Sequence, residues 1–262
     1  MKEYIAFIQA PDSPLHDRIV AFDALEMLVE SLDNANDLAP LGLWSPLLLL
    51  LRDDADEIRK HAAWTIGTAL RNNEKSQEHF LAKDGLTAVL ARLSGPDAEP
   101  CPPVLLKLIR IVSALLPYPK PFQSFYKAGG FPALAALLRT APPDADGTSL
   151  VQRILFSLTF CLEMRADDGV GVHQIAISTA LACAKSGAID AIVWVVEGRG
   201  SHAVLVDACL RLLCAVQRVH PPALDDRVRA AVKAAVPDDL VMAFDEEQRT
   251  SITEKLWELV PL

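Results

Sequence analysis

Several groups of side chains in this 262-residue sequence could do chemistry, but their spacing fails each test. The acidic run Asp53, Asp54, Asp56 and Glu57 could offer oxygen ligands to calcium, yet no glycine and terminal bidentate glutamate follow at the required spacing. The segment 144–147 fails the same test. The six histidines are scattered, and no phosphate loop, nucleophile elbow or HExxH motif occurs. We therefore expect no metal, no cofactor and no catalytic activity, and we interpret His61 as a solvated helix residue.

Composition narrows the possible partners and compartments. The chain is 51% hydrophobic, which suits a large core, and its net charge of −9 argues against nucleic acid as a partner. Unbroken apolar runs such as 47–51 are too short to span a bilayer, and the first residues lack the apolar length of a secretory signal. The five cysteines form no CxxC motif, so we interpret them as reduced core residues. A cytoplasmic monomer without a membrane partner is expected.

A repeated helical unit positions these residues. Glycine-led apolar segments begin at Gly42, Gly85, Gly130 and Gly187, which are 43, 45 and 57 residues apart. A period just above 40, built from helices alone, is typical of armadillo or HEAT arrays. One repeat cannot bury its own apolar face, and stacking successive copies buries a continuous core. We expect the glycine to permit the turn between the second and third helices of each repeat.

The helical pattern defines one all-α domain, a right-handed α-solenoid of armadillo repeats. About four repeats occupy 21–219, between an N-terminal cap at 1–20 and C-terminal capping helices at 220–262. The widest glycine interval suggests surface loops at 141–149 and 166–173. Asp245 and Gln248 have the spacing of a capping box for a last helix over 246–260. Long amphipathic helices are predicted at 58–72, 105–116, 151–164 and 205–219, as the second helices of the repeats.

The first repeat begins with a two-faced helix from residue 21. Its apolar side carries Phe22, Leu25, Val29 and Leu32, and acidic residues recur on the other side. The pattern predicts that this helix runs out into a polar elbow at Asn34–Asn36, where short polar side chains close a helix end.

Residues 21–93 resemble a particular family. The sequence LDNAN at Leu32–Asn36, the tryptophan Trp44, and IGTALRNNEKSQEHF at Ile66–Phe80 match the pattern of the fungal Fes-one and metazoan heat-shock-protein-70-binding-protein family. The resemblance is strong over about 15–95 and recognisable to about 200. A generic armadillo repeat would not supply this combination.

The resemblance implies a nucleotide exchange factor, or co-chaperone, for cytosolic heat shock protein 70 chaperones of the DnaK type. In that family the concave face of the solenoid grips the outer subdomain of the second lobe of the chaperone nucleotide-binding domain. The solenoid displaces the opposite lobe, so that ADP leaves, and binds no nucleotide itself. Family members also carry a flexible segment before the solenoid that releases clients. We expect this chain to lack that segment and to retain exchange.

Partner contacts carried over from the family fall on two asparagine groups. Asn34, Ala35 and Asn36 match LDNAN, where the small Ala35 would let a partner approach the backbone and a bulky residue would clash. Asn72 and Asn73 match the NN of the family. The alternative for both groups is structural, because asparagine also caps helices and forms elbows.

Basic residues on the later helices complete the implied contact set. Arg153 interrupts an apolar helix and matches a family arginine that could pair with an acidic chaperone surface. Lys107 and Arg110 could line the same groove. Nearby, this sequence differs from the family's ALSNL segment, because Ile111–Leu115 reads IVSAL and lacks the asparagine.

Two rival hypotheses remain open. A peptide-binding armadillo scaffold would present a ladder of asparagine and tryptophan, whereas here the tryptophans at 44, 64, 194 and 257 share no period and the asparagines stop at Asn73. A role in the endoplasmic reticulum is disfavoured by the missing signal and the unpaired cysteines.

Overall fold

The computed structural model describes residues 1–10, 12–164, 172–199 and 202–260, and its regular elements there are all helices. The chain divides into two compact units, Met1–Ala128 and Gly129–Leu262. The prediction of an all-α armadillo fold is confirmed, as the comparisons below also show. The division into one domain with its caps stays a prediction.

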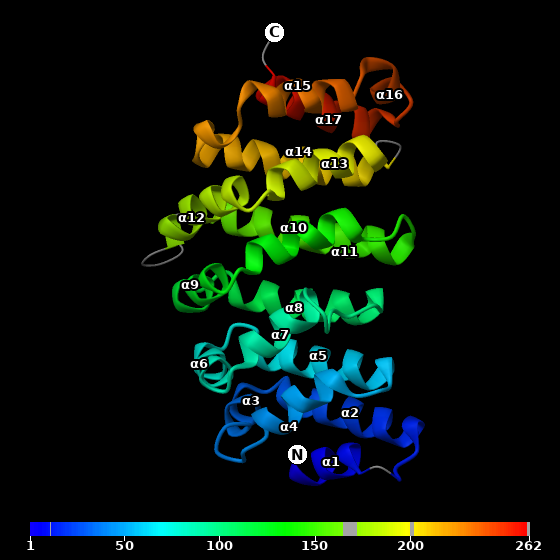
Figure 1. Cartoon of the computed structure of the whole chain (residues 1–262), viewed down its shortest axis with the longest axis vertical. Coiled ribbons are helices and arrows are strands. Elements are labelled where there is room, and N and C mark those ends of the chain that lie inside the picture. Colours follow the sequence, from blue (N-terminus) through cyan, green and yellow to red (C-terminus); the bar gives the residue numbers. More distant parts are fainter. Residues whose placement is uncertain (11, 165–171, 200–201, 261–262) are drawn as a thin grey trace. The chain divides into compact units, whose positions relative to one another are not determined.

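Unit 1 begins with a pair of helices, and two complete helix triplets follow it along the chain (Figure 1). The pair is α1 (Lys2–Gln9) and α2 (Leu15–Val29). The first triplet is α3 (Leu32–Asp37), α4 (Trp44–Leu49) and α5 (Asp56–Leu70), with a short 3-10 turn at Leu50–Arg52. The second is α6 (Glu74–Ala82), α7 (Gly85–Leu93) and α8 (Pro102–Leu115), and α9 (Pro119–Lys127) follows.

Unit 2 continues the same pattern. It begins with α10 (Gly130–Thr140) and α11 (Ala145–Glu163). A triplet of α12 (Val172–Lys185), α13 (Ala188–Arg199) and α14 (Ala203–Val219) follows, and a 3-10 turn at Pro221–Ala223 leads to α15 (Asp226–Ala235), α16 (Asp238–Met242) and α17 (Glu246–Leu259).

The long third helices of the triplets pack on one another within each unit. In unit 1, α5 lies between α2 and α8, and in unit 2, α14 lies between α11 and α17 (Figure 1). The predicted long helices at 58–72, 105–116, 151–164 and 205–219 are therefore confirmed to within a few residues at most ends. Their predicted place as second helices was wrong, since α5, α8 and α14 are the third helices of their triplets. Their apolar stripes form the core, as stacking of helical repeats requires.

Left-handed turns separate the first and second helices of the triplets. Gly42 and Gly187 have φ values of +73° and +76° and precede the second helices α4 and α13. Gly129, with φ of +80°, precedes α10 in the same way. The predicted position of the turn, between the second and third helices, was wrong. In the second triplet Asp84 takes the left-handed conformation, with φ of +56°, and Gly85 instead begins α7.

Side-chain caps fix several helix starts. The Asp245 carboxylate accepts a hydrogen bond from the backbone N–H of Gln248 at 2.8 Å, so the predicted cap at the start of the last helix is confirmed. The Asp144 carboxylate likewise accepts from the backbone N–H of Gly147 at 2.8 Å. Because this cap starts α11 at Ala145, the loop predicted at 141–149 was wrong in its second half. Most of the loop predicted at 166–173 lies outside the described residues.

Buried thiols belong to this core. Cys161, Cys183, Cys209 and Cys214 are buried and Cys101 is half-buried, all as free cysteines. Burial raises the pKa of Cys161 and Cys183 to about 12.

In the described part of the chain no single helix is long and apolar enough to cross a membrane; the bent pair Gln174–Lys185 and Ala188–Gly198 meets that test by length and composition only.

Candidate partner-binding site

The LDNAN segment forms a helix of its own, and the predicted polar elbow was wrong. Helix α2 ends at Val29, and Leu32–Asp37 coils again as α3. The prediction that Leu32 continues the apolar side of the first helix was therefore wrong, since Leu32 begins α3 and is 57% exposed. The side-chain amide of Asn34 donates to the backbone oxygen of Leu28 at 2.9 Å, which ties α3 to the end of α2. Asn34 therefore satisfies a carbonyl at a helix end, as the structural alternative predicted.

Ala35 points into the protein rather than toward a partner. Its exposed fraction is 2%, and α3 packs on α5 and α6. A bulky residue at position 35 would therefore clash with this core as well as with any partner that approaches α3. Asn36 is half-buried, and its Oδ1 has no hydrogen-bond partner among the described residues.

Asn72 and Asn73 form the elbow between α5 and α6. Asn72 is exposed in the left-handed conformation, with φ of +54°, and its Oδ1 accepts from the Tyr118 hydroxyl at 3.4 Å. Asn73 is buried and caps α6, where its Oδ1 accepts from the backbone N–H of Ser76 at 3.2 Å. Of the two, Asn72 alone offers its side chain at the surface.

A basic and aromatic cluster lies where α5 packs on α8. The ammonium of Lys107 lies 3.5 Å from the centre of the Trp64 ring, a cation–π contact. On α5, Trp64 stacks with His61, whose ring in turn stacks on Phe22. Arg110 follows Lys107 by three residues on α8 and lies against Gly67, where a Cβ would be 3.4 Å from its Cγ. The structure thus brings Lys107 and Arg110 to the same helix pair.

His61 is buried in this cluster, so its interpretation as a solvated residue was wrong. Burial lowers its pKa, although Asp23, with an oxygen 3.5 Å from Nδ1, acts in the opposite direction. Trp64 was missed by the sequence reasoning. The sequence signal that could have identified Trp64 was its position four residues after the polar Lys60, which places both side chains on the same face of the long helix.

Arg153 stands on α11 in unit 2. Its side chain is exposed, and its guanidinium forms no ion pair with a described residue. Nearby on the same helix are the exposed rings of Phe156 and Phe160. A guanidinium of this kind can pair with a carboxylate of another protein at little desolvation cost to the fold.

A buried ionic network holds the connection that leads into α8. The carboxylate of Glu99 accepts from Arg59 Nε at 2.8 Å and Nη2 at 2.9 Å, and it also pairs with Arg92. It accepts in addition from the backbone N–H of Cys101, just before α8. Burial alone would raise the pKa of Glu99, but the hydrogen bonds from the arginines outweigh it and leave the pKa lowered.

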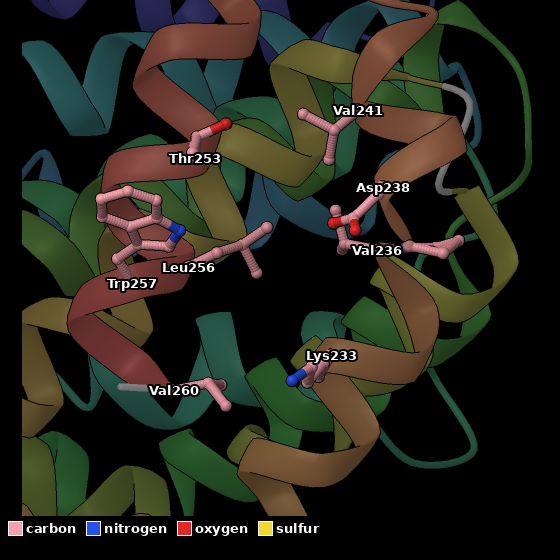
Figure 2. A pocket seen from close by; sticks show the side chains of 9 residues that line it. Lys233, Val236, Asp238, Val241, Thr253, Leu256, Trp257 and Val260 are labelled. Atoms are coloured by element: carbon pink, nitrogen blue, oxygen red, sulfur yellow. The ribbon is translucent and has the colours of Figure 1, made fainter. Parts of the chain in front are cut away.

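A groove of about 600 Å³ lies among α15, α16 and α17 (Figure 2). Leu256, Trp257 and Val260 line one side of it, and Lys233 and Asp238 lie across from them. Among the residues that the structure describes, no cluster of three histidine, cysteine or acidic side chains could hold a metal. The groove offers two opposite charges and an apolar wall, which is not the ligand set of a metal centre.

The stacked triplets define an armadillo-repeat protein. A designed armadillo repeat protein in complex with the peptide (KR)4 superposes with a TM-score of 0.63 over 98% of this chain and 98% of its own, at 14% identity. At that identity the likeness establishes the fold alone.

The sequence comparisons go further for the N-terminal part. Residues 1–38 match the family model "Nucleotide exchange factor Fes1". The Hsp70 nucleotide exchange factor FES1 of Kluyveromyces lactis is 33% identical over 168 residues, 64% of this chain and 58% of that protein. The protein of the same name from Gibberella zeae is 48% identical over 98 residues, 37% of this chain and 46% of that protein.

These comparisons confirm the resemblance inferred from the LDNAN and IGTALRNN motifs. The chain spans about half the length of the curated relatives it matches.

Proposed function

We propose that this protein is a nucleotide exchange factor, a non-enzymatic co-chaperone, for cytosolic heat shock protein 70. The observation that carries the proposal is the similarity to named Hsp70 nucleotide exchange factors at 33% and 48% identity. The protein would act by holding one lobe of the chaperone nucleotide-binding domain and displacing the other, which opens the cleft and speeds ADP release. It needs no cofactor, because its contribution is binding energy directed at the open form of the chaperone.

Basic side chains in both units would make the contacts with the chaperone. In unit 1, Lys107 lies over the Trp64 ring and Arg110 lies against Gly67. In unit 2, Arg153 offers a charge-assisted hydrogen bond to a carboxylate. In a chain of net charge −9, such basic positions select where an acidic partner surface can approach.

The asparagine motifs take a different part in the proposal. Asn34, Asn36 and Asn72 are partly or fully exposed and can meet the partner directly. Ala35 and Asn73 are buried, and they would act by fixing the backbone of α3 and the start of α6.

The test measures nucleotide release directly. Heat shock protein 70 loaded with a fluorescent ADP analogue is mixed with excess unlabelled ATP, with and without this protein, in a stopped-flow instrument. We expect the protein to increase the ADP release rate. Folded protein that leaves the rate unchanged would exclude the proposal. Binding to extended peptides without binding to the chaperone would favour the peptide scaffold instead.

The proposal includes a monomer in the cytosol. Light scattering after size exclusion reports the mass, for which a monomer of 28.5 kDa is expected. Fractionation of cells that express the tagged protein tests the compartment. Recovery with the endoplasmic reticulum lumen would favour the lumenal alternative.

A further inference from the structure

A small cavity lies between α6 and α9 in unit 1, where these two helices are in contact (Figure 1). Its volume of about 220 Å³ is below the roughly 300–1,000 Å³ of sites for drug-sized molecules, so it suits one long side chain. One wall is the side of α6 that carries Glu74, Gln77, Glu78 and Leu81, and the other is the segment Tyr118–Pro121. We call it the α6–α9 cavity.

Hydrogen bonds hold the walls of the α6–α9 cavity in place. The buried side-chain amide of Gln77 donates to the backbone oxygens of Leu70 at 3.0 Å and Ala114 at 3.2 Å, which joins α6 to the ends of α5 and α8. The Tyr118 hydroxyl donates to Asn72 Oδ1 at 3.4 Å. Because the walls are fixed in advance, a side chain that enters loses little free energy to rearrangement of the site.

Two carboxylates give the cavity its charge. Glu74 is the first residue of α6 and forms no ion pair with another described residue. Glu78 pairs with Lys120 at 2.9 Å, and both of these side chains are exposed. Burial raises the pKa of Tyr118, and the negative charge of Glu74 raises it further, so this carboxylate acts on the phenol from close by. Since like charges four residues apart on a helix repel, a cation beside Glu74 and Glu78 would be favourable.

The remaining lining is apolar and aromatic. Leu81, Pro119 and Pro121 offer apolar surface to the aliphatic stem of a long side chain. The ring of Tyr118 offers a face that attracts a cation. A guanidinium fits this combination better than an ammonium does, because it is planar, is more weakly hydrated, stacks on aromatic rings and pairs with a carboxylate through two hydrogen bonds.

We propose that the α6–α9 cavity binds a single arginine side chain from an exposed segment of a partner polypeptide. The guanidinium would pair with Glu74 and stack on Tyr118, and its aliphatic stem would cover Leu81. The net charge of −9 attracts a basic segment toward this surface. The site is separate from the exchange function proposed above, because the basic residues assigned to the chaperone require an acidic partner surface and this cavity requires a basic one.

The binding test uses the full chain without any chaperone. The probe is the peptide acetyl-Ala-Arg-Ala-amide, and binding is followed by NMR of the leucine methyl groups, among which Leu81 reports on the cavity. Peptides with lysine or methionine in place of arginine are the matched comparisons. We expect saturable binding of the arginine peptide, weaker binding of the lysine peptide, and binding of the uncharged methionine peptide that is weaker by roughly 10-fold or more.

Variants of the two walls test the assigned contacts. Glu74→Gln should raise the Kd of the arginine peptide roughly 10-fold, because it removes a charge-assisted hydrogen bond. The matched control is Glu3→Gln, which removes an exposed carboxylate from the first turn of α1 and should change Kd less than about twofold. Tyr118→Leu should raise Kd about 2- to 5-fold, whereas Tyr118→Phe keeps the ring and should not. Unchanged thermal unfolding midpoints show that these losses do not come from misfolding.

Lys120 supplies a test in the opposite direction. Lys120→Met frees Glu78 from its ion pair, so the Kd of the arginine peptide should fall about 2- to 5-fold. Lys127→Met, at the other end of α9, makes the same change in net charge and should have no comparable effect.

Three results would overturn the proposal. Equal affinity for the arginine and methionine peptides would show a general apolar cavity, and equal affinity for the arginine and lysine peptides would remove the preference for a guanidinium. A slower ADP release from heat shock protein 70 with Glu74→Gln than with wild type would assign Glu74 to the chaperone surface. Arginine-peptide binding by a protein that leaves ADP release unchanged would exclude the exchange function and support the cavity.

Discussion

Replacing Glu99 by Gln should lower the free energy of unfolding far more than the exchange of one side-chain atom would suggest. The Glu99 side chain has no exposed surface, and the side chains of Arg59 and Arg92 are only 11% and 12% exposed. Glutamine keeps the shape but removes the charge, so two guanidinium groups would remain close together without a counter-ion. Breaking a buried ion pair by removing one partner costs about 3–5 kcal/mol.

The matched control is Glu78→Gln on α6. Glu78 also pairs with one basic side chain, Lys120, at 2.9 Å, but both side chains are exposed, and such pairs contribute little to stability. Thermal unfolding followed by circular dichroism at pH 7 compares the variants. With a shift of about 2–4 °C per kcal/mol for a chain of this size, Glu99→Gln should lower the unfolding midpoint by roughly 6–20 °C.

The pH dependence gives a second, independent measure. Because the folded-state pKa of Glu99 is lowered from its ordinary value of 4.5, its contribution is complete above pH 4.5 and is lost as the pH falls through the folded-state pKa. The stability difference between wild type and Glu99→Gln should therefore shrink on acidification below pH 4.5. A midpoint shift no larger than that of Glu78→Gln, or a difference independent of pH, would refute the electrostatic reasoning.

Other predictions concern the core. Ala35→Arg should lower the free energy of unfolding by about 1–3 kcal/mol, measured by urea denaturation, because the larger side chain must displace α3. Gly85→Ala should cost a similar amount, since the new Cβ would lie 2.4 Å from the buried ring of Phe80; Gly198→Ala, with nothing within 4 Å, should be neutral or stabilising. Cys183, with a pKa of about 12, should resist alkylation at pH 8 until the chain unfolds, as mass spectrometry of labelled peptides would show.

The long helices could be predicted because their apolar stripes repeat over three or more turns. Ile58, Ile66 and Leu70 in α5 are all buried, as the period requires. The segment at 32–37 could not, because its asparagines have poor helix propensity and resemble an elbow. Packing of Ala35 and Leu38, both buried, outweighs that propensity and coils α3.

The candidate site was predicted in residue type more than in geometry. The basic positions Lys107 and Arg153 reach the surface as their helical spacing indicates. The sequence does not reveal that Lys107 lies over Trp64, since these residues are 43 positions apart and meet only through the packing of α5 on α8. The buried network of Glu99 was likewise hidden, because an acidic residue in a loop ordinarily suggests solvent.

The uneven burial of the tryptophans gives each unit its own optical reporter. Trp44 is fully buried in unit 1 and meets Phe80 edge-on, whereas Trp194 and Trp257 of unit 2 are 42% and 67% exposed. Emission from a buried indole lies at shorter wavelength than emission from a hydrated one. Loss of the short-wavelength part of the emission therefore reports the unfolding of unit 1. The ammonium of Lys107 lies over the Trp64 ring, so the emission intensity of Trp64 should change when a binding partner moves that ammonium away.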